Sequence, residues 1–271
     1  MGFAEYGVSG GQPVFYFHGH PGSRLDWPGL IHDAIDVELN ARVIAVDRPG
    51  HGLSDFYPDR KLLDWPDDVV ELADALSLDR FSVLGVSGGG PYAAACAFKI
   101  PERLNATAIV CGMGPVESPG CKDGLSWVYA GKGSLRRRLL LLLTSTGLQK
   151  QPDKFIAAIN EGMSGPDKAL VLGKPELVKN IASGFSEAFS PGIAGVHLEA
   201  ELCNSPWGFR LEDISAEVHL WHGEQDDNVL VSVGRYVADT LPNCRATFVK
   251  EEGHLSLIHN CVREYLSVLV V

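Results

Sequence analysis

The chain has 271 residues, of which 23 are basic and 34 acidic, so its formal net charge is −11. This balance argues against nucleic acid as the main partner, because nucleic-acid-binding proteins collect Lys and Arg on one face. Hydrophobic residues make up 45% of the chain and charged residues 21%, which is ordinary for a soluble globular enzyme with a large core. The length fits one large domain, or one domain that carries an insertion.

The sequence predicts neither a membrane span nor export. Residues 1–6 contain neither the basic stretch nor the apolar run of a secretion signal. The five leucines at 139–143 are too few to cross a bilayer. The six cysteines form no Cys-x-x-Cys pair, and we expect reduced thiols. The sequence therefore predicts a cytoplasmic protein.

The first 114 residues alternate short apolar runs with helical patterns. Apolar runs between turn-forming residues predict buried strands, and apolar residues spaced by three and four predict helices. We expect strands at 13–17, 42–46, 80–83 and 106–111, and helices at 25–39, 66–78 and 92–98. This alternation is typical of a parallel sheet with helices on both faces.

From residue 115 to residue 206 the alternation stops and helical patterns dominate, at 126–144, 152–163, 166–189 and 196–202. We expect a helical cap inserted into an α/β core made of residues 1–114 and 207–271. Such caps close over a pocket and supply apolar walls, for which Trp127, Phe155, Phe185 and the leucines at 139–143 are candidates. The alternation resumes with strands at 217–221 and 246–249 and helices at 229–241 and 255–271.

A Gly-x-Ser-x-Gly pattern at Gly85, Ser87 and Gly89 stands between a predicted strand and a predicted helix, the setting of a nucleophile elbow. The turn is sharp and strains the serine backbone, so its neighbours must be small. The Gly88 amide opens a helix, whose N-terminus favours developing negative charge. A small-residue turn without chemistry stays an alternative. A phosphate-binding loop is disfavoured, because no Lys-Ser/Thr pair follows.

An activated serine needs a base, and the base needs an acid that orients it. Asp226 and His254 each follow a predicted strand, and the carboxyl ends of parallel strands share one edge of the sheet. The order Ser87, Asp226, His254 is the one expected for a nucleophile on an elbow. Asp227, the next residue after Asp226, stays an alternative acid.

Two further glycine-rich loops follow predicted strands: His18-Gly19-x-Pro21-Gly22 and Asp47-Arg48-Pro49-Gly50-His51-Gly52-x-Ser54. Together with the elbow and the pair Gly223-x-x-Asp226 and Gly253-His254, these loops resemble the α/β-hydrolase family in its lidded branch. The resemblance runs from the strand at 13–17 to the last helix. It implies a mostly parallel central sheet with helices on both faces and an inserted cap.

The resemblance also implies a role for each matching residue. Ser87 would attack a carbonyl carbon, and His254 would take its proton and then give it to the leaving group. Asp226 would hold the imidazole in the useful tautomer. The backbone amides of His20 and Gly88 would form the oxyanion hole.

The other histidines in these loops, His18, His51 and His222, are expected to support the loops beneath the site. His259 is expected to pack or lie at the surface. A metal site built from His18, His20 and His51 lacks the spacing of a zinc motif. We expect no metal and no cofactor.

A serine nucleophile limits the reaction. Haloalkane dehalogenases and epoxide hydrolases need Asp at the elbow, because a serine ether could not be hydrolysed. Proline iminopeptidases usually carry Trp where this chain has Gly88, and they need an acid to hold a substrate amine. We expect hydrolysis of a carboxylic ester of a small, partly apolar molecule through an acyl-enzyme. A peptidase, a C–C hydrolase, a haloperoxidase and a small-molecule receptor with slow hydrolysis stay open.

Overall fold

The computed structural model describes residues 1–30, 35–124 and 135–271, apart from 153, 155, 156, 159, 160, 162 and 164. Within these residues seven strands form one sheet, in the order β1-β3-β2-β4-β5-β6-β7. β1 runs antiparallel to β3, and the other neighbours are parallel. The strands are β1 (Phe3–Gly7), β2 (Gln12–Phe17), β3 (Ala41–Val46), β4 (Phe81–Val86), β5 (Leu104–Val110), β6 (Val218–Gly223) and β7 (Cys244–Val249).

This sheet confirms the predicted α/β architecture, and the six predicted strands correspond to β2 to β7. β1 was not predicted. It pairs Phe3 with Val46 of β3, and its residues are half-buried or exposed. An edge strand of this kind contains no continuous apolar run, so periodicity alone does not reveal it.

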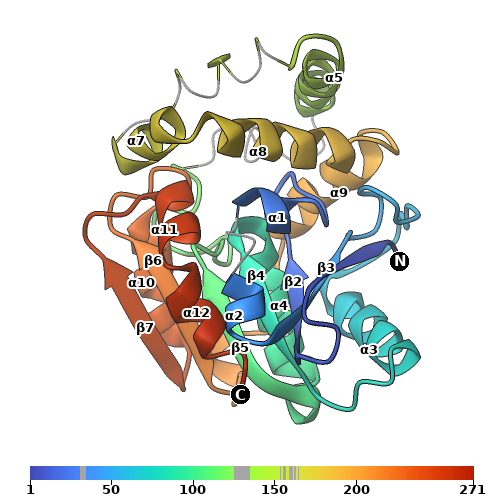
Figure 1. Ribbon diagram of the computed structural model, residues 1–271, viewed down its shortest axis with the longest axis vertical. Helices are drawn as coiled ribbons and strands as arrows, with labels where there is room; N and C mark the ends of the chain where they lie inside the picture. The colour runs from blue at the N-terminus through green and yellow to red at the C-terminus, as the bar shows by residue number, and fades with distance from the viewer. Residues whose placement is uncertain are drawn as a thin grey trace.

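Helices cover both faces of the sheet (Figure 1). Phe15 and Phe17 of β2 point to one face, where the Phe17 ring lies 5.2 Å from that of Trp65. Val14 and Tyr16 point to the other face, which α11 and α12 cover. The helices around the sheet are α1 (Asp26–Leu30), α2 (Ile35–Glu38), α3 (Trp65–Ala75), α4 (Gly90–Lys99), α10 (Val231–Thr240), α11 (His254–Asn260) and α12 (Val262–Ser267).

Between β5 and β6 the chain forms a group that we call the inserted helices: α5 (Leu135–Lys150), α7 (Gly165–Gly173), α8 (Pro175–Ala188) and α9 (Ala194–Cys203). Figure 1 shows them across one end of the sheet, above α1 and α11. α8 contacts α1, and α7 contacts α11. Since α1 and α11 follow the carboxyl ends of β2 and β7, the inserted helices cover that edge of the sheet.

Two of the helices that were predicted over fully described residues are in fact pairs. The prediction at 166–189 is wrong as one helix, because Pro175 cannot continue a helix and instead begins α8. The prediction at 255–271 divides into α11 and α12 near Cys261. Of the predicted pocket residues, Trp127 and Phe155 lie outside the described residues, and Phe185 is half-buried beside two hydrophobic clusters.

In the leucine run on α5 only Leu141 is buried, whereas Leu139, Leu140, Leu142 and Leu143 are exposed. The sequence expectation that these leucines form apolar walls is therefore not supported for the four exposed ones. A helix that could reach across a bilayer is absent from the part of the chain that the structure describes.

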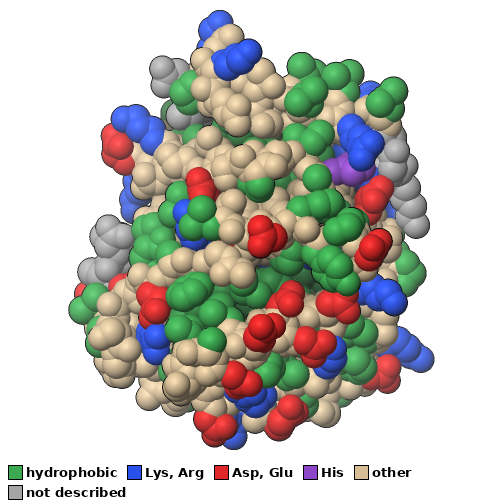
Figure 2. Space-filling view, turned by 90° about the vertical axis from the view of Figure 1, so that its right-hand side faces the viewer, with side chains coloured by type: hydrophobic (Ala, Val, Ile, Leu, Met, Phe, Trp, Pro, Cys, Tyr) green, Lys and Arg blue, Asp and Glu red, His purple; other side chains and the backbone are tan. Residues whose placement is uncertain are grey.

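The side of the molecule that carries α3 faces the viewer in Figure 2, with acidic side chains spread over its lower half and hydrophobic ones around a hollow. A groove of about 410 Å³ lies between α3 and the loop before it. Its lining residues are Met1, Pro49, Ser54, Asp55, Tyr57, Asp68, Glu71, Leu72 and Ala75. None of the predicted site residues is among the described residues that line this groove. Those site residues are Ser87, Asp226, His254, His20 and Gly88.

Candidate active site

Ser87 occupies the sharp turn between β4 and α4. Its φ is 53°, a left-handed conformation that costs a non-glycine residue about 1–3 kcal/mol. A Cβ added to Gly85 would collide with the Gly89 carbonyl oxygen, and one added to Gly89 would collide with the Phe17 carbonyl oxygen, so the close approach of β2, β4 and the turn requires both glycines. The Met113 amide donates to the Ser87 carbonyl at 3.0 Å, which ties the turn to the 111–113 loop.

The loop after β2 lies beside this turn. A Cβ built on Gly19 would be 3.6 Å from Ser87 Cβ. A Cβ built on Gly88 would be 3.1 Å from the His20 amide nitrogen and 2.6 Å from His20 Cβ. The two residues whose amides were predicted to bind an oxyanion are therefore neighbours in space.

Asp226 and His254 form a buried hydrogen-bonded pair. His254 Nδ1 donates to Asp226 Oδ2 at 2.7 Å. The second oxygen, Asp226 Oδ1, accepts from the amides of Asn228 at 2.9 Å and Val229 at 2.8 Å. The alternative acid Asp227 is exposed. The imidazole therefore pairs with Asp226.

Each member of this pair shifts the pKa of the other. Burial alone would raise the pKa of Asp226, but the His254 imidazole holds it below its ordinary value. Burial alone would lower the pKa of His254, but the Asp226 carboxylate raises it above the ordinary 6.5. Asp167 and Asp227 raise it further. His254 is thus a stronger base than an ordinary histidine.

Ser87 and His254 approach the same loop from two sides. The Ser87 carbonyl binds the Met113 amide, and Cys111 Sγ lies 3.7 Å from the His254 carbonyl oxygen. No hydrogen bond between the described residues joins Ser87 Oγ to the His254 imidazole. Such contacts are often long before substrate binds.

His18 and His222 support the loops, as their positions predicted. The Arg48 amide donates to His18 Nε2 at 3.3 Å, so the proton of the neutral ring is on Nδ1, which donates to the Gly19 carbonyl at 2.8 Å. Burial holds the pKa of His18 well below its usual range. His222 Nε2 donates to the Val229 carbonyl at 2.7 Å, within the Asp226 loop.

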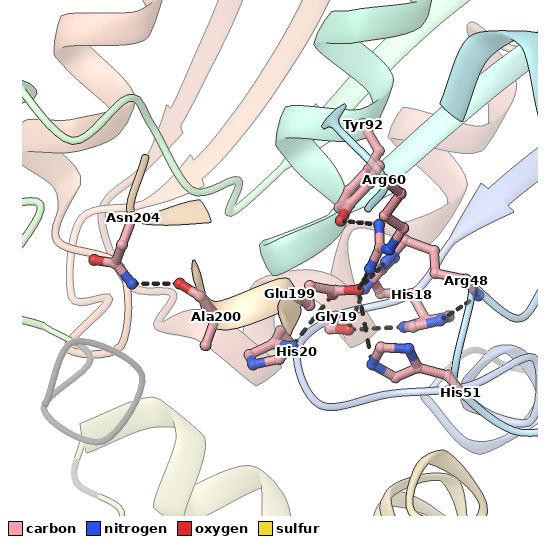
Figure 3. Close-up of polar contacts among 10 residues, drawn as sticks. All are labelled: His18, Gly19, His20, Arg48, His51, Arg60, Tyr92, Glu199, Ala200 and Asn204. Atoms are coloured by element: carbon pink, nitrogen blue, oxygen red, sulfur yellow. Dashed lines mark hydrogen bonds and ion pairs between the residues drawn. The ribbon is translucent and has the colours of Figure 1, made fainter. Parts of the chain in front are cut away.

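Glu199 of α9 is fully buried at the centre of a charged cluster (Figure 3). Its carboxylate accepts from Arg48 Nη2 at 2.5 Å and Nε at 2.9 Å, and from Arg60 Nη2 at 3.3 Å. His20 Nδ1 lies 3.2 Å from the same carboxylate. We call these four residues the Glu199 cluster. Burial alone would raise the pKa of Glu199, but the Arg48 guanidinium holds it well below its usual range.

Arg48 also holds the loop that carries His20. Its Nη1 donates to the His18 carbonyl at 2.6 Å, and its Nη2 donates to the Gly19 carbonyl at 2.8 Å. Its guanidinium lies 4.7 Å from the centre of the Tyr92 ring. The Glu199 cluster therefore connects α9 to the loops after β2 and β3, and to α4 beneath them.

Two groups of side chains have the spacing of metal ligands. In each group the ligand atoms lie within 4.8 Å of one another; the groups are His20, His51 and Glu199, and Cys111, Asp226 and His254. In the first group two guanidiniums already bind the carboxylate of Glu199, and their charge opposes a cation. In the second, Asp226 Oδ2 and His254 Nδ1 already form a hydrogen bond with each other.

The sequence analysis did not predict Asp167 of α7, or Glu199 and Arg60 of the Glu199 cluster. Asp167 accepts a hydrogen bond from the His254 amide, 87 residues away. Glu199 binds Arg48, 151 residues away. No local pattern marks such pairs, although His20 and Arg48 both lie in the glycine-rich loops.

A family model for the alpha/beta hydrolase fold matches residues 12–260. A serine hydrolase-like protein of Danio rerio is 33% identical over 109 residues, which are 39% of this chain and 32% of that protein. A 2-hydroxymuconate semialdehyde hydrolase of Pseudomonas putida is 26% identical over 234 residues, 82% of this chain and 73% of that one. A solved thermophilic esterase from Thermogutta terrifontis has a TM-score of 0.70 at 20% identity and the same fold, over 100% of this chain and 94% of the esterase. From the match over residues 12–260, together with the parallel sheet and the Ser87 turn, we conclude that the chain belongs to the α/β-hydrolase family.

Proposed function

We propose that the protein is a serine hydrolase that cleaves carboxylic esters of small, partly apolar molecules through an acyl-enzyme. The observation that carries this proposal is the buried hydrogen bond between His254 and Asp226, together with a serine in left-handed backbone that contacts the same 111–113 loop as His254. The family match supports hydrolysis in general. The ester bond and the individual roles are the proposal.

In this mechanism His254 Nε2 takes the proton of Ser87 Oγ while Oγ attacks the ester carbonyl carbon. The Asp226 carboxylate keeps the proton on Nδ1, so Nε2 is the basic atom. The imidazolium then gives its proton to the departing alcohol. A water molecule, activated by the same imidazole, attacks the acyl-enzyme and releases the acid and the free serine.

The oxyanion of the tetrahedral intermediate would be bound by the amides of His20 and Gly88. The Gly19 carbonyl accepts from Arg48, and a planar trans peptide places the His20 N–H on the side opposite that carbonyl. The His20 amide therefore points away from Arg48, and its nitrogen would lie 3.1 Å from a Cβ built on Gly88. An oxyanion-hole donor contributes about 3–4 kcal/mol to transition-state stabilisation.

The inserted helices would serve as the cap of this site. They cover the carboxyl edge of the sheet, where ligands of open α/β sheets bind, and Glu199 of α9 contacts His20 directly.

The Glu199 cluster favours an uncharged ester over a peptide with a free amine. A peptidase would need an acid to hold the amine. Glu199 is buried beside His20, but Arg48 and Arg60 already neutralise its carboxylate. A primary ammonium group would have to compete with two guanidiniums for the same oxygens.

Hydrolysis of a semialdehyde is the second candidate function. The observation that favours it is the 2-hydroxymuconate semialdehyde hydrolase that matches this chain over 73% of its own length. A substrate panel that includes both esters and such a semialdehyde separates the two candidates.

Replacing the nucleophile tests the mechanism. Ser87→Ala should abolish hydrolysis of p-nitrophenyl esters from acetate to decanoate and leave the circular dichroism spectrum unchanged, because only Oγ is lost. The exposed Ser267→Ala is the matched control and should keep the wild-type rate. A Ser87→Ala protein with wild-type activity would exclude the mechanism.

Comparing variants of the neighbouring residues Asp226 and Asp227 tests which carboxylate orients the imidazole of His254. Asp226→Asn should lower kcat by about 10⁴, because the amide favours the wrong imidazole tautomer. The exposed Asp227→Asn should retain most of the activity. If Asp227→Asn causes the larger loss of kcat, Asp226 is not the acid.

The pH dependence tests the base. Because the Asp226 carboxylate raises the pKa of His254 above 6.5, kcat/KM should rise with pH through a single pKa above that value. The folded protein binds this proton more tightly than the unfolded chain does. The resulting contribution to stability is complete below pH 6.5 and is lost as pH rises through the folded-state pKa. As pH rises through this window, kcat/KM should therefore increase while the free energy of unfolding, measured with urea, decreases. A flat rate profile between about pH 5 and pH 9 would contradict the role of His254.

Neutralising Glu199 tests the cluster. Glu199→Gln leaves Arg48 and Arg60 buried without a counter-charge, which should lower the free energy of unfolding by about 3–5 kcal/mol. In the variant that remains folded at low temperature, kcat should fall, because Arg48 no longer holds the His20 loop. Glu212→Gln, which removes a surface carboxylate paired with Arg210, should change neither quantity. Equal stability of the two variants would show that the cluster does not hold the loop.

A further inference from the structure

The helix that begins at His254 lacks a side-chain cap of its own. The first amides of a helix have no intrahelical partner, and an N-cap side chain normally accepts from the third of them. In α11 the N-cap residue is Gly253, which has no side chain. Ser256 completes only half of a capping box, since its Oγ accepts from the Gly253 amide at 2.8 Å.

Asp167 supplies the missing half from α7. Its Oδ1 accepts from the Ser256 amide at 2.9 Å, the contact that an N-cap side chain would make. Its Oδ2 accepts from the His254 amide at 3.0 Å. Asp167 exposes only 3% of its surface, so these hydrogen bonds are shielded from water.

The absence of a side chain at Gly253 leaves room for this contact. A Cβ at that position would lie 2.5 Å from Asp167 Oδ1, where no side chain fits. The glycine of the Gly253-His254 motif thus leaves room for a carboxylate that comes from the inserted helices. The hydrogen-bond acceptor at the N-terminus of α11 therefore comes from Asp167, a residue distant in the chain, because Gly253 has no side chain that could accept.

We infer that Asp167 is the positioning residue of His254: it caps the helix of the base from α7, so the base is aligned only while α7 is seated on α11. This inference rests on the proposed role of His254 in hydrolysis. It assigns a function to α7 that goes beyond lining a pocket.

The charge of Asp167 also acts on the imidazole. The groups that face His254 are Asp226, Asp167, Asp227, His222 and Cys111. Burial lowers the pKa of His254, the Asp226 carboxylate raises it most, and Asp167 raises it further. Removing the charge of Asp167 should therefore lower the pKa of His254 and leave its hydrogen bond to Asp226 in place.

The test compares four variants of the full chain: Asp167→Asn, Asp167→Ala, the double variant Asp167→Ala with Gly253→Ser, and Glu176→Gln. The last removes an exposed carboxylate from α8 and is the charge control. Three quantities are measured: hydrogen exchange of the 254 and 256 amides, the NMR titration of the His254 imidazole, and the pH dependence of kcat and KM.

We expect the two amides to exchange at least about tenfold faster in Asp167→Ala, and kcat to fall about tenfold to a hundredfold with little change in KM. In the double variant, the hydroxyl introduced by Gly253→Ser caps the helix locally, so protection and kcat should recover while the pKa of His254 stays low. Asp167→Asn, which keeps the shape, should lower that pKa, and Glu176→Gln should change nothing.

Unchanged amide exchange and an unchanged His254 titration in Asp167→Asn and Asp167→Ala would overturn the inference. The same holds if Glu176→Gln lowers the pKa as much as Asp167→Asn. The exchange and titration need no substrate. If Ser87→Ala remains active while Asp167 variants alter His254, the proposed function fails and the positioning role stands.

Discussion

The buried ion pair between Glu199 and Arg48 is the interaction on which the arrangement of the site depends. Both side chains are fully excluded from water, so each charge needs a buried counter-charge, and Arg60 is a second partner of Glu199. Arg48 in turn binds the carbonyls of His18 and Gly19, which sets the direction of the next amide. A single charge pair thereby links α9 to the loop that faces the serine.

Three buried carboxylates have different structural roles around Ser87. Asp226 orients the imidazole, Glu199 fixes the His20 loop through Arg48, and Asp167 caps the helix that begins with His254. Two of the three come from the inserted helices, although the proposed catalytic groups themselves follow strands of the sheet. The proposed site is therefore complete only when the inserted helices are packed against the sheet.

The sequence predicted what local patterns encode. The strands β2 to β7 are apolar runs, the Ser87 turn has its glycines, and the Gly223-x-x-Asp226 motif contains the carboxylate that binds His254. Glu199 and Asp167 escaped prediction because their partners are 151 and 87 residues away, and a carboxylate on a helix is typical of a solvated surface. β1 was missed because an edge strand needs no apolar run. Helical periodicity alone does not separate α7 from α8, which divide at Pro175.

Labelling with a fluorophosphonate probe tests the central claim most directly, with peptide mapping to locate the modified residue and p-nitrophenyl esters to measure turnover. The proposed mechanism predicts covalent modification at Ser87 alone, together with rapid multiple turnover of one class of ester. Labelling of Ser87 without turnover of any ester or semialdehyde would point to a ligand receptor instead. An unmodified Ser87 in the folded protein would contradict the account, since the strained turn would then hold no activated nucleophile.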